Sequence, residues 1–361
     1  MTSIQQFMPH WRMRQVDHVA VIAHPDVAYE AVRAVDLYRL PLARGLFALR
    51  LLPEWIAALL GGQGPRLRPT ATIEDITAPG NGFHLLSDGD HEVVVGAVGR
   101  FWQKNIEFAD VDRETFAGYD HRGWGKLAWN IAVAPRAPSG SWITVDLRVD
   151  AGDEAAWDRF QRYWRLIGPF SHAIRRALMH RFAHDLGTPP PDDARRLVGD
   201  DLLPGARAQL THAIDIEAPP DRVWPWLVQM GGRRAGWYSW DRLDNGGVPS
   251  ADHIVPELQH LAVGDLIPAT PHDTAGFEVL GVEPGRALVL GGGTHLYDGT
   301  WTFALEPIGD TATHLVTRYR AAYEPGPRMV LMRSALTPVH AFMERKQLRT
   351  LKQRAESAPR A

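Results

Sequence analysis

The chain has 361 residues, more than one ordinary hydrophobic core needs and about the length of two domains of common size. Its 45% hydrophobic and 22% charged residues are typical of a soluble globular protein, and a net charge of −3 argues against a nucleic-acid partner. The absence of cysteine excludes disulfides, thiol nucleophiles and cysteine-ligated metals, and it fits a reducing compartment.

The N-terminal part of the chain predicts no targeting or membrane-spanning segment. The first fifteen residues contain no apolar run of signal-peptide length. The most apolar stretch, 40–60, is interrupted by Arg44, Arg50, Pro53 and Glu54, so we expect a packed helical segment and no transmembrane helix. We therefore expect a cytoplasmic protein.

The sequence repeats itself at a nearly constant offset. An offset of 194 residues relates His18 to His212, and the same offset relates Phe83 to Phe277. Further along, Trp129 matches Trp301 at an offset of 172, so the first copy carries 22 additional residues, near 98–120. This repeat predicts one fold used twice.

Each copy reads as a strand, a helix opened by proline, about five further strands and a long C-terminal helix. Strands grouped between helices predict an α+β fold with an antiparallel sheet in each copy. We expect a first domain over 1–187, which includes the apolar segment 40–60, and a second over 206–357. The Pro-, Gly- and Asp-rich stretch 188–205 predicts a surface linker.

Alternation along the last strands of the second copy assigns their two faces. Trp301, Phe303, Thr317 and Tyr319 share the apolar face, which must meet the long helix. Arg318 and Arg320 take the other face, which we expect to be solvated. A sheet curled around one helix leaves space between them, and we expect the four apolar-face residues to contact a ligand there.

The order of elements, the strand–Pro–helix opening at 212–226 and the long last helix resemble the START-like (SRPBCC, helix-grip) superfamily. The resemblance covers both copies, and it is carried by GGRRAGWYSWDRLDNGG at 231–247 and GKLAWNIAV at 125–133. Members of this superfamily include lipid-transfer domains and bacterial polyketide cyclases. The resemblance implies two tandem helix-grip domains, each a curved antiparallel sheet wrapped around a C-terminal helix, and it does not fix an activity.

The segment that follows the first helix of the second copy is the most distinctive. We predict that Trp237, Tyr238 and Trp240 contribute to a ligand site, because the superfamily places its cavity mouth here. Tyr238 and Asp241 are also candidates for proton transfer. The alternative is a structural turn that arginine–aspartate pairs hold together.

A glycine-rich turn between two strands, at 291–300, adds two further candidates. His295 and Asp298 have the side chains of an acid and a base at the presumed cavity rim. Residues of this kind more often satisfy the backbone of a turn.

No motif predicts a metal or a cofactor. His180 and His184 have the i, i+4 spacing of two ligands on one helix face, but no HExxH motif and no third ligand accompany them. Phosphate-loop, dinucleotide-binding and GxSxG motifs are absent from the sequence.

Three functions remain open on the sequence. The first is binding of a hydrophobic or aromatic small molecule, mainly in the second domain. A second is a cofactor-independent enzyme of the cyclase, aromatase or lyase type that acts on a polyketide-like or lipid substrate. The third is a protein-interaction module like the chaperone activators of the superfamily, for which the first copy is the better candidate.

Overall fold

The computed structural model describes residues 3–40, 70–271, 276–294, 297–324 and 326–357. The chain divides into two compact units, Met1–Pro189 and Pro190–Ala361. Most of the segment 188–205, for which we expected a surface linker, therefore lies within the second unit. The apolar segment 40–60 lies outside the described residues after Leu40.

The first unit contains a five-stranded antiparallel sheet, with strands in the order β1-β5-β4-β3-β2. Its strands are β1 (Met13–Val21), β2 (His84–Asp88), β3 (Glu92–Gly99), β4 (Gly125–Pro135) and β5 (Ser141–Ala151). The shorter helical elements of this unit are α1 (Ile4–Phe7), α2 (Pro25–Arg33), η1 (Leu37–Arg39), α4 (Ile73–Thr77) and α5 (Arg113–Phe116). Helix α5 belongs to the additional residues of the first copy.

The second unit repeats this topology and adds one short edge strand, in the order β6-β11-β10-β9-β8-β7. Its strands are β6 (Ala208–Ile216), β7 (Leu266–Pro268), β8 (Gly276–Glu283), β9 (Ala287–Thr294), β10 (Tyr297–Ile308) and β11 (Ala312–Tyr323). The shorter helical elements here are η2 (Asp200–Leu202), α7 (Pro220–Val228), α8 (Asp241–Asp244) and η3 (Pro256–Leu258).

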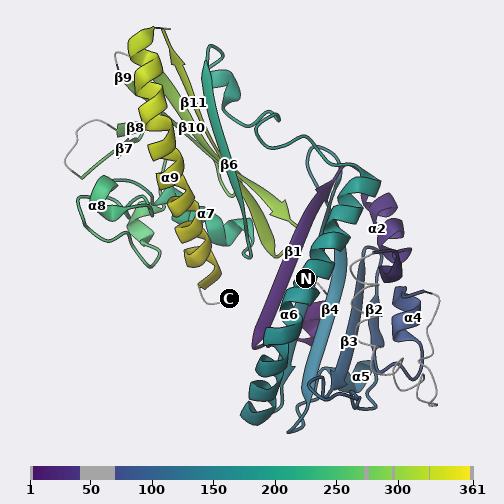
Figure 1. Ribbon diagram of the computed structural model, residues 1–361. Helices are drawn as coiled ribbons and strands as arrows, with labels where there is room; N and C mark the ends of the chain where they lie inside the picture. The colour runs from purple at the N-terminus through teal and green to yellow at the C-terminus, as the bar shows by residue number, and fades with distance from the viewer. Residues whose placement is uncertain (1–2, 41–69, 272–275, 295–296, 325, 358–361) are drawn as a thin grey trace. The chain divides into compact units, whose positions relative to one another are not determined.

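One long helix closes each unit along its own sheet (Figure 1). Helix α6 (Glu154–Leu186) packs on β1, and α9 (Pro327–Ser357) packs on β6. The side chain of Asp153 caps α6 by accepting a hydrogen bond of 2.7 Å from the Ala156 amide. The predicted α+β class, with a helix-grip arrangement in each half, is confirmed.

The core of each unit lies between the sheet and the long helix. In the second unit Phe303, Leu305 and Leu315 are buried on the sheet face that meets Leu348 and Leu351 of α9. The predicted alternation of inward and outward residues is therefore correct for the inward side of these strands.

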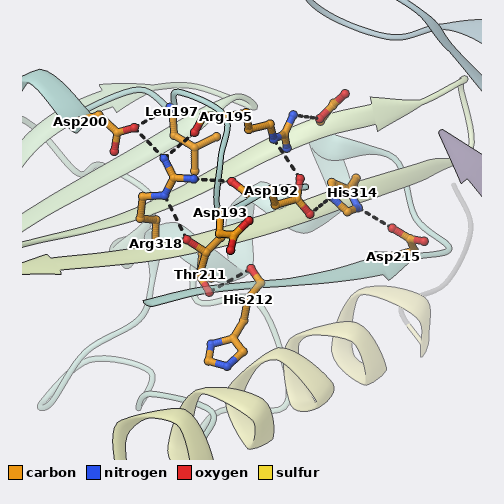
Figure 2. A network of polar contacts seen from close by, with 12 residues as sticks. Asp192, Asp193, Arg195, Leu197, Asp200, Thr211, His212, Asp215, His314 and Arg318 are labelled. Atoms are coloured by element: carbon orange, nitrogen blue, oxygen red, sulfur yellow. Dashed lines mark hydrogen bonds and ion pairs between the residues drawn. The ribbon is translucent and has the colours of Figure 1, made fainter. Parts of the chain in front are cut away.

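The outward side of the second sheet differs from the expectation, because it is not solvated. Arg318 is only 1% exposed. Its Nη1 contacts Asp200 Oδ2 at 2.6 Å and donates to the Arg195 carbonyl at 2.8 Å, while its Nε donates to Thr211 Oγ1 at 3.1 Å. Residues 192–202 therefore cover this face of the sheet and neutralise its buried cation (Figure 2).

The outward face of the first sheet is covered in the same way by the N-terminal residues. Arg148 is 2% exposed; its Nη1 donates to the Met8 carbonyl at 2.8 Å, and its Nη2 pairs with Asp146 Oδ2 at 3.0 Å. Strand alternation gives the face of a residue, but it does not say whether a distant segment packs on that face.

His314 on β11 contacts two carboxylates, one on β6 and one in the segment 192–202 that covers the outer face of the second sheet. Its Nδ1 lies 2.6 Å from Asp215 Oδ1, and its Nε2 lies 3.1 Å from Asp192 Oδ2 (Figure 2). Burial by itself would lower the pKa of His314, but the two carboxylates outweigh burial and raise this pKa to about 9.

We predict that His314→Gln destabilises the second unit in a pH-dependent way. Because the folded-state pKa lies above the unfolded-state value, the stabilisation by His314 is fully present below about pH 6.5 and is lost as the pH rises through about 9. The substitution should lower the free energy of unfolding by about 3 kcal/mol near pH 6 and by much less near pH 10. Urea unfolding of both proteins at the two pH values measures this, and an equal loss at both would contradict it.

Candidate functional site

A cavity of about 420 Å³ lies between the second sheet and α9. Strands β6, β8, β10 and β11 supply one wall, α9 supplies the opposite wall, and the segment from Trp237 to Asp244 contributes to the lining. The lining includes Trp237, Ser239, Asp244, Phe277, Tyr297, Trp301, Tyr319, Ala321, His340, Met343 and Glu344.

Aromatic rings make up much of this lining. The Trp237 and Trp301 rings are stacked, with centroids 5.6 Å apart and planes 25° apart. Phe277 meets Trp237 edge-on at 5.5 Å, and Trp237 Nε1 is fixed by a 2.8 Å hydrogen bond to the Ala269 carbonyl. These contacts hold flat apolar surfaces in place, which suits a flat apolar ligand.

One buried carboxylate, Glu344 of α9, lies in the wall of the cavity and is 2% exposed. His212 Nδ1 lies 2.5 Å from Glu344 Oε2, Trp301 Nε1 donates to Oε1 at 3.2 Å, and Thr317 donates a side-chain hydrogen bond. His212 points from β6 toward the helix, on the side of the sheet opposite Arg318 (Figure 2). These contacts anchor the closing helix to β6, β10 and β11.

A second histidine, His340, lies one helical turn before Glu344. Its Nε2 is 3.8 Å from Glu344 Oε2, and its ring lies 5.0 Å from the Tyr319 ring and 5.6 Å from the Trp301 ring. His340 and Glu344 therefore form a polar corner beside the aromatic rings of the lining.

The charges in this corner follow from burial and from the contacts. Burial lowers the pKa of His340, more than the Glu344 charge raises it, so His340 is neutral at pH 7. Burial alone would raise the pKa of Glu344, but the His212 hydrogen bond and the other contacts lower that pKa below its ordinary value. Among the residues that the structure describes, no group of three or more His, Asp or Glu side chains is arranged to hold a metal ion.

Asp244 gives the lining a second carboxyl group. Burial, and then the charge of Asp241, raise the pKa of Asp244 to about 6, while a hydrogen bond with Ser239 opposes them. A carboxyl group with this pKa exchanges protons near neutral pH.

The residues expected on the apolar face of the sheet lie in or beside this cavity. Trp237, Trp301 and Tyr319 line it. Phe303 and Thr317 are fully buried on the same face, behind the lining residues.

Tyr238, Trp240 and Asp241 do not belong to the lining that the structure describes. Tyr238 is buried with φ at 58°, and its hydroxyl accepts a 2.6 Å hydrogen bond from Gln229. Trp240 is 41% exposed and stacks on Phe342, and Asp241 Oδ1 accepts a 2.6 Å hydrogen bond from Ser250. These contacts agree with the alternative of a structural turn.

The glycine-rich turn contributes little that the structure describes. His295 lies outside the described residues, and Asp298 is exposed on β10. Its neighbour Tyr297 lines the cavity and forms a hydrogen bond with Tyr319.

Sequence reasoning missed Glu344 and His340, and it gave His212 no role in a site. A signal for two of them was present, since His340 and Glu344 are four residues apart on the predicted closing helix and therefore share a face. Their pairing with His212, 132 residues away from Glu344, has no local signal.

The first unit also contains a cavity, of about 500 Å³, between its sheet and α6. Its lining is mostly aliphatic, with Trp129 and Phe170 as its aromatic residues. The one charged residue in the described lining, Arg175, contacts Asp17 at 2.6 Å and donates to Gln15 at 2.7 Å. The described lining of this cavity contains no counterpart of the corner formed by Glu344 and His340.

We predict that Tyr238→Phe affects stability and leaves the cavity unchanged. The substitution removes the acceptor of the Gln229 hydrogen bond, which should cost about 1 kcal/mol of unfolding free energy. Burial raises the pKa of Tyr238 to about 12, so the phenol is neutral at physiological pH. Urea unfolding and benzophenone photolabelling of the cavity test this, and a loss of labelling in the stable variant would restore Tyr238 to the site.

Part of the chain is similar to a known protein family. Residues 207–356 match the family model described as polyketide cyclase / dehydrase and lipid transport. No curated protein is similar enough in sequence to match.

Several solved structures are similar to the chain. They include the di-domain ARO/CYC protein BexL of the BE-7585A biosynthetic pathway (13% identity, 96% of this chain and 100% of that one, TM-score 0.25). A second is the di-domain ARO/CYC protein StfQ of the steffimycin pathway (13%, 95% and 98%, TM-score 0.27). A third is a Mesorhizobium loti protein (19%, 42% and 100%, TM-score 0.28). At these TM-scores, none of the three bears on the activity.

In the part of the chain that the structure describes, every helix is too short or too polar to cross a bilayer. The family match over 207–356 spans the six-stranded sheet of the second unit and nearly all of its closing helix. The second unit thus matches the family model for polyketide cyclase / dehydrase and lipid transport over residues 207–356, and the two units are tandem domains of START-like, helix-grip fold.

Proposed function

We propose that the second unit binds a hydrophobic, aromatic small molecule in the cavity between its sheet and α9. The observation that carries the proposal is the cavity itself, about 420 Å³ of space lined by Trp237, Phe277, Trp301 and Tyr319. A space of this size with mostly apolar walls and a few polar groups is typical of small-molecule sites. The description of the matched family, which includes lipid transport, supports a role of this kind.

The expected affinity follows from the apolar area that such a ligand buries. A ligand of two or three fused rings that buries about 300 Å² gains about 7 kcal/mol from apolar burial alone. That free energy corresponds to a dissociation constant of several micromolar before ordering costs are subtracted. We therefore expect binding in the micromolar to submillimolar range.

A cofactor-independent enzyme of the cyclase, aromatase or lyase type is the second candidate. Polar groups that can exchange protons lie in the same lining, among them Asp244, with its raised pKa, and the Glu344 corner. The family description, which names cyclase and dehydrase activities, supports this candidate.

The binding proposal predicts where an aromatic photoprobe will react. Benzophenone, incubated with the full chain and irradiated, should label Met343 and its neighbours on α9, because these residues line the cavity. Peptide mapping by mass spectrometry locates the label. Ala321→Phe, on the cavity wall, should remove this label, because the new ring occupies the ligand's space.

Ala322→Phe is the matched control. It is the same substitution at the next residue of β11, where strand alternation turns the side chain to the other face of the sheet. This variant should be labelled like the wild type. Labelling of Met343 that persists in Ala321→Phe, or labelling confined to the first unit, would contradict the proposed site.

A further inference from the structure

We infer that the cavity of the second unit is a proton-transfer site in which His340 is the catalytic base and Glu344 is its positioning residue. This inference rests on the proposed function, because the cavity must first bind a ligand. It goes further by naming the base and the class of molecule on which that base acts.

In the pair formed by Glu344 and His340, the Glu344 carboxylate is held in place by hydrogen bonds and is not the group that accepts a proton from the ligand. Three hydrogen-bond donors on three strands surround its carboxylate: His212 on β6, Trp301 on β10 and Thr317 on β11. A buried carboxylate matched in this way stays ionised and fixed, and it presents a constant negative charge to its remaining neighbour.

That remaining neighbour is His340, which does not take part in the anchoring contacts. Its Nε2 faces Glu344 Oε2 at 3.8 Å, a distance at which charge acts but no hydrogen bond forms. The same nitrogen is buried and has no hydrogen-bond partner among the described residues. If Nε2 carries its proton toward Glu344, Nδ1 is the ring nitrogen left to accept a proton from a ligand.

The surroundings keep His340 ready to accept that proton. The groups around it that can titrate are Glu344 on its own helix, His212 on β6, Tyr319 on β11 and Tyr297 on β10, with Asp244 elsewhere in the lining. Burial lowers the pKa of His340, and burial raises the pKa of Tyr319, so at pH 7 both are neutral beside an ionised Glu344. As His340 takes up a proton, its positive charge develops next to that carboxylate, which stabilises it.

The lining also indicates the chemical class of the substrate. The stacked Trp237 and Trp301 rings fit a flat polycyclic or aromatic molecule. A neutral imidazole at this position suits the removal of a proton from a carbon next to a carbonyl group. In that step the C–H bond breaks, the proton passes to His340, and the electron pair forms an enolate; the proton then returns to the same or another carbon.

The probe for the test is 2-tetralone, a bicyclic aromatic ketone with acidic protons next to its carbonyl. In D₂O the wild-type chain should accelerate exchange of these protons for deuterium, which ¹H NMR measures as loss of the corresponding signals. His340→Phe keeps a ring beside Tyr319 and Trp301 and removes the base, so the catalysed rate should fall about 100-fold or more. Glu344→Gln should lower the rate at saturating 2-tetralone about tenfold or more while the dissociation constant stays within twofold.

Three controls separate this mechanism from a structural role. His253→Gln changes an exposed histidine that pairs with Asp252 and does not line the cavity. This variant should catalyse the exchange at the wild-type rate. Calorimetry measures 2-tetralone binding by every variant, and circular dichroism verifies folding. If His340→Phe does not fold, His340→Asn replaces it.

Each outcome bears on a different claim. Exchange that persists in the folded His340 variant, or that is lost in His212→Asn but not in the His340 variant, would contradict the assignment of the base. Binding of 2-tetralone without any accelerated exchange would contradict the inference and leave the proposed binding function standing. No binding of 2-tetralone by the wild type would contradict the proposed function as well.

Discussion

The site depends on one geometric constraint, namely that a single helix must cover a much wider sheet. Six strands spaced about 4.8 Å apart span about 24 Å, whereas a helix with its side chains is about 10–12 Å across. Helix α9 therefore covers only part of the apolar face of its sheet, and the segment around Trp237 contributes to the rest of the lining. The cavity is the space that remains between these three parts.

The same constraint explains why a charged residue lies on the closing helix. A helix that covers only part of the width of a sheet needs specific contacts to fix its position. Glu344 supplies them by bonding to His212, Trp301 and Thr317. Helix α6 of the first unit carries an arginine, Arg175, that contacts Asp17 and Gln15 of β1. Both helices are thus anchored by a charged residue. Among the lining residues that the structure describes, a neutral histidine accompanies the anchor in the second unit but not in the first.

Much of the fold could be predicted from the sequence, because the strand alternation and the proline-opened helices are local patterns and the repeat is visible as a constant offset. The segments that cover the outer faces of the sheets could not be predicted, since nothing in the sequence of β11 indicates that residues 192–202 pack on it and pair with Arg318. For the site, alternation correctly put Trp301 and Tyr319 on the cavity side. The conspicuous Tyr238 and Asp241 do not line this cavity and are hydrogen-bonded to Gln229 and Ser250. Glu344 and His340 lie in a helix whose polar residues look like a solvated face.

The central claim is that open apolar space exists under the second sheet, and xenon binding tests it most directly. Xenon enters apolar cavities that water leaves empty. A crystal of the full chain pressurised with xenon should show a xenon peak bordered by Trp237, Trp301 and Met343. A crystal in which side chains of the chain itself fill that space and no xenon binds there would contradict the account.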